Sequence, residues 1–173
     1  MKPRDLIPTQ REKPMREGDY IVSTTDLDGR ITSANPVLLE FSGYSEAELI
    51  GVQHNILRHP DMPRAVFRLA WDTIRHGEDF HGYIKNLAKD GGHYWVFAHI
   101  RPEYDANGEP TGYRSVRRCP RRDAVNKAAA LYANMLAAEH AAGPRDAIDA
   151  GMAVLRAALA ESGLGYEEFV AAL

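Results

Sequence analysis

The sequence predicts an α+β fold in which short helices cover one face of an antiparallel sheet. Three observations lead to this class. Two short β-rich segments near the N-terminus are separated by an Asp-Gly pair, a stretch of helical character follows, and three further β-rich segments precede an alanine-rich tail. Strands and helices that are segregated in this way favour an antiparallel sheet over a parallel one.

The strands are marked by runs of β-forming residues between turn signals. The first two flank the pair Asp28-Gly29, which favours a tight hairpin turn. The last three are separated by turns that contain glycine, such as Asn107-Gly108. The five predicted strands are residues 20–25, 30–33, 80–87, 93–104 and 113–118.

Between the two groups of strands the sequence carries helix signals. Asn35 is a suitable N-cap, and Pro36 suits the first helical position. Ser45, with Glu48 three residues later, forms a capping box for another short helix. The longest helix of this part of the chain is predicted for residues 62 to about 76.

The chain is expected to divide into three parts. A polar arm with three prolines is expected to be flexible, a sensor domain holds all five strands, and a helical segment for signalling or interaction follows. In the last segment, Gly143-Pro144 is expected to separate two helices. The three parts are residues 1–18, 19–120 and 121–173.

Composition and motifs exclude several classes of protein. The formal net charge of −3 over 173 residues gives no overall basic balance of the kind that favours nucleic acid, and the local basic stretch in residues 114–122 is expected to be a solvated strand end and helix start. The single cysteine, Cys119, cannot form an intramolecular disulfide or a zinc ribbon. No signal peptide or membrane-spanning run is visible, so the protein is expected to be cytoplasmic. No catalytic motif is present, and we expect neither an enzyme nor a metal site.

The run His54–Pro63, HNILRHPDMP, resembles the HN..RHPDMP signature of aerotaxis-receptor PAS domains. Further matches occur in the order and approximate spacing of that family, and the resemblance covers residues from about 19 to 125. They are Thr24-Thr25-Asp26-Leu27, Asn35, Ser42-Gly43-Tyr44, Glu48-Leu49 with Gly51, Trp71, Lys85-Asn86, His93-Tyr94-Trp95-Val96, Gly112-Tyr113 and Ser115-Val116-Arg117.

The resemblance implies a PAS fold, which is a five-stranded antiparallel sheet with short helices that form a pocket on one face. It also implies non-covalent FAD, whose redox state reports oxygen or respiratory status. Through the C-terminal helices the protein would then contact a separate chemoreceptor or another signalling protein, and a homodimer is possible.

The resemblance also implies which residues would hold FAD. Asn86 would offer an amide donor and acceptor to the pyrimidine edge of the flavin ring. The loop before the long helix would hold the ribityl-diphosphate or gate protonation of the ring, and Trp71 would supply an aromatic wall. The expected cofactor-binding residues are Asn35, Arg58, His59, Asp61, Trp71, Phe80 and Asn86.

The sequence departs from the family at one position, and two alternatives to FAD stay open. Phe80 stands where the family commonly has a tryptophan, which keeps an aromatic face but loses the indole N–H. The first alternative is a heme-binding gas sensor with His76 or His81 as the axial ligand. The second is a ligand-free interaction module in which Phe80 fills the flavin space. Cys119 does not match the helix-borne cysteine with which LOV photoreceptors form a flavin adduct.

Overall fold

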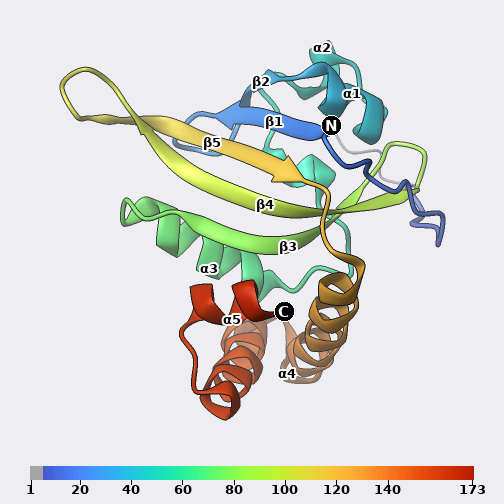
Figure 1. Cartoon of the computed structure of the whole chain (residues 1–173), viewed down its shortest axis with the longest axis vertical. Helices are drawn as coiled ribbons and strands as arrows, with labels where there is room; N and C mark the ends of the chain where they lie inside the picture. The colour runs from blue at the N-terminus through green and yellow to red at the C-terminus, as the bar shows by residue number, and fades with distance from the viewer. Residues whose placement is uncertain (1–5) are drawn as a thin grey trace.

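The protein consists of a five-stranded antiparallel sheet with helices packed on it, as seen in a computed structural model that describes residues 6–173 (Figure 1). The predicted α+β class and the PAS-type sheet are confirmed. In chain order the elements are β1 (Tyr20–Thr25), β2 (Ile31–Ala34), α1 (Pro36–Ser42), α2 (Glu46–Leu49), the 3-10 helix η1 (His54–Leu57), α3 (Arg64–Arg75), β3 (Phe80–Leu87), β4 (His93–Tyr104), β5 (Pro110–Arg118), α4 (Arg122–Ser162) and α5 (Tyr166–Ala172).

The strand order in the sheet is β2-β1-β5-β4-β3. The first and last strands in the sequence, β1 and β5, are therefore neighbours in the middle of the sheet. The central register pairs Ser23 of β1 with Ser115 of β5, and Ser115 with Ile100 of β4. Because side chains alternate between the faces of a sheet, these three residues point to the same face. The helices α1, α2 and α3 cover that inner face, and the cavity described below lies there.

The short helices begin where their capping residues allow. The side-chain oxygen of Asn35 accepts a hydrogen bond from the backbone N–H of Leu38, at 3.0 Å, and Pro36 occupies the first turn of α1. Ser45 and Glu48 form the predicted capping box of α2. Local sequence therefore determined these two helices, since each cap satisfies backbone donors that the first turn leaves open.

The C-terminal segment wraps around the free edge of the sheet at β3 (Figure 1). Gly143, with φ of 77°, interrupts α4 next to Pro144, as the sequence predicted. Before this kink, Tyr132 stacks on Trp95 with ring centroids 6.3 Å apart, and its hydroxyl donates to the carbonyl of Tyr83 at 2.8 Å. After the kink, α4 packs on α3, and α5 returns to β3.

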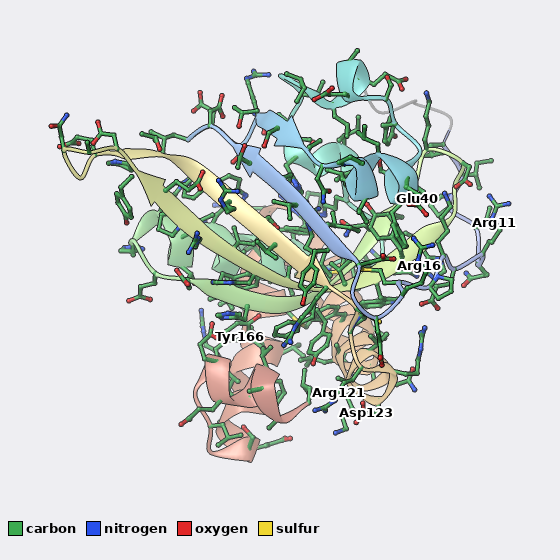
Figure 2. All side chains as sticks on the ribbon, turned by 45° about the horizontal axis from the view of Figure 1, so that its top comes forward. Arg11, Arg16, Glu40, Arg121, Asp123 and Tyr166 are labelled. Atoms are coloured by element: carbon green, nitrogen blue, oxygen red, sulfur yellow. The ribbon has the colours of Figure 1, made fainter. Side chains whose placement is uncertain are left out.

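The described part of the predicted N-terminal arm makes ordered contacts with the domain. The backbone N–H of Lys13 donates to the carbonyl of His93 at 2.7 Å, and Met15 is buried. Arg16 pairs with Glu40 of α1 at 3.1 Å, and both side chains lie at the surface in Figure 2. Residues 1–5 of the arm lie outside the described residues, and its flexibility stays a prediction.

Candidate functional site

A cavity of about 340 Å³ lies between α3 and the inner face of the sheet. Its size falls within the range of small-molecule sites in proteins. Most of its described lining comes from η1, α3 and the four strands β1, β3, β4 and β5. The lining residues are Ser23, Thr25, Gly29, Gln53, His54, Asn55, Arg58, Arg64, Phe67, Arg68, Ala70, Trp71, Ile74, Ile84, Asn86, Ile100, Tyr113, Ser115, Arg117 and Ile148.

Trp71 forms part of the apolar wall of the cavity. Its ring meets the ring of Tyr113 edge-on, with centroids 5.4 Å apart. A β-carbon at Gly29 would lie 2.8 Å from the Trp71 ring, and Gly29 also has a positive φ of 80°. Glycine in the β1–β2 turn therefore lets the tryptophan approach the backbone closely. Both residues belong to the lining, as the sequence expectation for Trp71 required.

Asn86 provides an unpaired donor at the sheet side of the cavity. Its side chain is 4% exposed, and its Nδ2 has no hydrogen-bond partner among the described residues. A buried amide N–H without an acceptor costs about 1–3 kcal/mol. A ligand with an acceptor atom in the cavity would remove this cost, and the ligand contact expected for Asn86 stays a prediction.

A second polar group in the cavity consists of Arg117, Ser23 and His54. The guanidinium of Arg117 donates through Nη2 to the hydroxyl oxygen of Ser23, which lies 3.2 Å from Nε2 of His54. Burial, together with the charge of Arg117, lowers the pKa of His54 to about 3. The imidazole is therefore neutral at physiological pH, and its Nε2 can accept the hydroxyl proton of Ser23.

Arg58 joins the cavity to the loop that precedes α3. Its Nη2 donates to the carbonyl of Met62 at 2.9 Å, and its guanidinium lies 4.8 Å from the ring centroid of Phe67 on α3. The backbone of Arg58 also forms a β-bridge with Asn86. Arg58 therefore connects Asn86, which lines the cavity, directly to the start of α3.

His59 and Asp61 lie on the far side of this loop, and among the described residues neither lines the cavity. His59 is buried, and its Nδ1 accepts from the backbone N–H of Asp61 at 3.1 Å. Lys85 donates to the carboxylate of Asp61 at 2.6 Å. Burial would raise the pKa of Asp61, but the hydrogen bond and charge of Lys85 outweigh it and lower that pKa. The contacts of these residues therefore join the loop to Lys85 of β3.

Asn35 and Phe80 also lie outside the lining that the structure describes. Asn35 uses its amide to join α1 to β1, because its Nδ2 donates to the carbonyl of Tyr20 at 2.7 Å and its Oδ1 accepts from Val22 at 3.0 Å. Phe80 is fully buried and stacks on Tyr166 with centroids 5.7 Å apart, and Figure 2 places Tyr166 between α5 and the sheet edge.

The cavity residues that the sequence reasoning missed include the polar group of Arg117, Ser23 and His54. One signal was available for Arg117. In the strand alternation it shares a face with Tyr113 and Ser115, which is the core side, and a charge at a core position of a strand is unusual. Arg64 and Arg68 of α3 also line the cavity, and because both are exposed they lie at its mouth.

Within residues 6–173, no cluster of three or more His, Cys, Asp or Glu side chains could hold a metal ion. The same part of the chain contains no helix with the length and apolar character needed to cross a membrane.

Comparison with known sequences finds similar proteins. The chain is 44% identical over 109 residues to the aerotaxis receptor of Escherichia coli (strain K12), a match that covers 63% of this chain and 21% of the receptor. It is 31% identical over 104 residues to the nitrogen fixation regulatory protein of Klebsiella pneumoniae, covering 60% and 21%. The chain thus spans about a fifth of the length of these relatives.

Solved structures and a family model identify the fold. A structure described as "Flavin Analogue Sheds Light on Light-Oxygen-Voltage Domain Mechanism" matches with a TM-score of 0.56 at 23% identity, covering 62% of this chain and 81% of that one. The dark structure of the blue-light photoreceptor Aureochrome1 LOV matches with a TM-score of 0.54 at 24% identity, covering 64% and 80%. The family model described as PAS fold matches residues 31–117, half of the chain. The sheet, the cavity on its inner face and these matches together show that the chain belongs to the PAS-fold family.

Proposed function

We propose that this chain is a sensor that binds FAD non-covalently, responds to its redox state and signals by contact with another protein rather than by catalysis. The observation that carries the proposal is the cavity, which combines apolar walls with the unpaired amide donor of Asn86. Sites for flavin rings need this combination of apolar surface and a few directed polar groups. The likeness to an aerotaxis receptor supports the energy-taxis role.

In this proposal the cavity residues would hold the different parts of FAD. Asn86 would donate to the pyrimidine edge of the ring, and Trp71 and Ile84 would contact its faces. At the mouth, Arg64 and Arg68 offer positive charge for the diphosphate, which distinguishes a dinucleotide from riboflavin. When bound, FAD supplies the electron-accepting chemistry, and the protein supplies the binding and the response.

The contacts of the loop before α3 provide a route for the signal. Arg58 contacts the cavity, the carbonyl of Met62 and the ring of Phe67. The next residues begin α3, where backbone N–H groups donate to Glu139 of α4. A shift of the loop would therefore change the position of the C-terminal helices. A differential free energy of about 1–3 kcal/mol is sufficient for such a coupling.

The proposed readout is a protein interaction through α4 and α5. These helices would dock on a separate chemoreceptor or another signalling protein, or on a second copy of this chain. Since the matched relatives are much longer than this chain, the partner and the localisation are part of the proposal, and we place the protein in the cytoplasm.

The absorption spectrum of the purified protein tests the proposal. Two flavin bands, with the chromophore released intact as FAD on denaturation, are expected. Asn86→Ala should lose the flavin, whereas Asn126→Ala, on an exposed position of α4, should retain it. A fully yellow Asn86→Ala protein would contradict the role of Asn86, and a colourless wild type that does not take up added FAD would contradict the proposal itself.

The same spectrum decides the two alternatives. A Soret band would indicate heme, but His76 is exposed at the end of α3, and His81 stacks on His99 with centroids 4.4 Å apart. Neither lines the cavity among the residues described. The ligand-free module would need the flavin space to be filled, whereas Phe80 packs against Tyr166 and the cavity is open.

A further inference from the structure

Arg117 is the largest of the side chains that the fold buries completely, with 1% of its surface exposed. It projects from β5 on the inner face of the sheet and lines the cavity. Moving a guanidinium out of water costs several kcal/mol unless an opposite charge or a full set of hydrogen bonds replaces the hydration. A buried arginine in a cavity therefore indicates a ligand with acceptor atoms or a negative charge.

The described residues provide hydrogen-bond acceptors for only some of the N–H groups of Arg117. Nη2 donates to Ser23, but Nε and Nη1 are buried and have no hydrogen-bond partner among residues 6–173. A guanidinium has five N–H donors in a fixed plane, so several of them point to no acceptor. Asn86 Nδ2, in the same cavity, is likewise unpaired.

No aspartate or glutamate among the described lining residues compensates the charge of Arg117. The described lining contains Arg58, Arg64 and Arg68 besides Arg117, and no aspartate or glutamate, although the whole chain carries a formal net charge of −3. Burial lowers the pKa of Arg117 to about 10, so the side chain is still a cation at physiological pH.

The two titratable neighbours of Arg117 do not supply a counter-charge either. Burial lowers the pKa of His54, and the charge of Arg117 lowers it further, so the imidazole is neutral. Burial raises the pKa of Tyr94, against a smaller opposing effect of Arg117, so its hydroxyl is neutral as well. The positive charge is therefore available to a ligand.

We propose that Arg117 binds the acceptor edge of the ligand ring and makes the cavity prefer the reduced, anionic form of FAD over the oxidised, neutral form. This inference rests on the proposed function and adds the residue that sets the redox preference. A flavin that takes up two electrons and one proton carries one negative charge, which resides at the pyrimidine edge. A fixed cation at that edge stabilises the charge without reorganisation, because the sheet already holds it in place.

The test compares three proteins: the wild type, Arg117→Gln, which keeps hydrogen bonding but loses the charge, and Arg117→Lys, which keeps the charge. For each, the affinity for oxidised FAD is measured by fluorescence, and the midpoint potential is measured anaerobically with dithionite as reductant against a reference dye. In Arg117→Gln the ratio of affinities for reduced and oxidised FAD should fall at least tenfold, which lowers the two-electron potential by about 30 mV. Arg117→Lys should stay within about threefold of the wild-type ratio.

A measurement on the ligand-free protein separates a redox role from a structural one. Arg117→Met removes the unpaired buried charge, so the midpoint of thermal unfolding without FAD should be unchanged or raised, while the stabilisation added by FAD should shrink. An unchanged affinity ratio in Arg117→Gln, or an Arg117→Met protein that unfolds earlier without FAD and keeps the full FAD stabilisation, would overturn the role of Arg117. A wild type that binds no FAD would overturn the proposed function, and this inference with it.

Discussion

The carboxylate of Glu139 accepts a hydrogen bond from the backbone N–H of Ala65 at 2.9 Å, although the two residues are 74 positions apart. Its second oxygen accepts from the N–H of Arg64, also at 2.9 Å. The C-terminal segment thus caps the first turn of α3, where a negative charge also interacts favourably with the helix dipole. Glu139 is buried at 4% exposure, so the two hydrogen bonds are shielded from water.

Replacing Glu139 by alanine should release the C-terminal helices from α3. Two buried backbone donors lose their acceptor, and we expect the free energy of unfolding to fall by about 1–3 kcal/mol. Urea unfolding measures the stability, and limited proteolysis near Gly143 measures the release. Glu161→Ala, on an exposed position of the same helix, serves as the control. Unfolding and proteolysis that match the control would show that the cap contributes nothing.

Gly151→Ala should destabilise the same contact. A β-carbon at Gly151 would lie 2.6 Å from Oε1 of Glu139 and 2.9 Å from the β-carbon of Ala65. In a helix, exchange of glycine for alanine normally stabilises by about 0.5–1 kcal/mol. A lower midpoint of thermal unfolding would therefore show that close packing of α4 on α3 outweighs helix propensity. A higher midpoint would contradict the packing.

Asn35→Ala should lower stability without affecting the cavity. The Asn35 amide makes hydrogen bonds to β1 and caps α1, so its loss should cost about 1–3 kcal/mol. Because Asn35 lies outside the described lining of the cavity, FAD affinity should change less than about threefold in protein that is still folded. A selective loss of FAD would instead support the cofactor contact expected from the sequence.

Stability should fall as the pH drops below about 6.5, the ordinary pKa of histidine in an unfolded chain. Burial and Arg117 lower the pKa of His54 to about 3 in the folded protein, so between these values the unfolded state binds one proton more. The slope from this group is at most about 1.4 kcal/mol per pH unit. Urea unfolding between about pH 7 and pH 5 measures it, a window that lies above the titration of ordinary carboxylates.

His54→Gln provides the comparison for this pH dependence. The variant should flatten the slope, whereas His76→Gln, at an exposed position, should leave it as in the wild type. Equal slopes in all three proteins would refute the assignment of the acid sensitivity to His54.

Phe80→Trp should not improve flavin binding, although it restores the residue that the family commonly has. Phe80 is fully buried against Tyr166, and its ring lies so close to Gly82 that even a β-carbon there would approach it to 2.9 Å, so a larger indole would have to displace these neighbours. Overpacking of this kind costs about 1–3 kcal/mol. Unfolding curves and FAD titration, with Phe80→Leu as the smaller variant, measure both effects. Tighter FAD binding by the tryptophan variant would contradict this placement of residue 80.

Much of the fold could be read from local patterns. The residues of β1, β3 and β4 were predicted with their observed bounds, because alternation and Gly-containing turns are local signals. The caps at Asn35 and Ser45 act within one turn. The 3-10 helix η1 was missed, since four residues carry no periodic pattern, and α3 begins at Arg64 rather than Met62.

By itself, the sequence determined the fold class, the strand segments, the break at Gly143 and the resemblance to a PAS family, because these depend on residues close together in the chain. Only the tertiary structure decided which side chains meet. In the structure Arg117, Ser23 and His54 contact one another in the cavity, Phe80 packs against Tyr166, and Glu139 accepts hydrogen bonds from the first turn of α3. Such contacts join residues far apart in sequence, and their partners follow from strand register and helix packing, which local propensity does not encode.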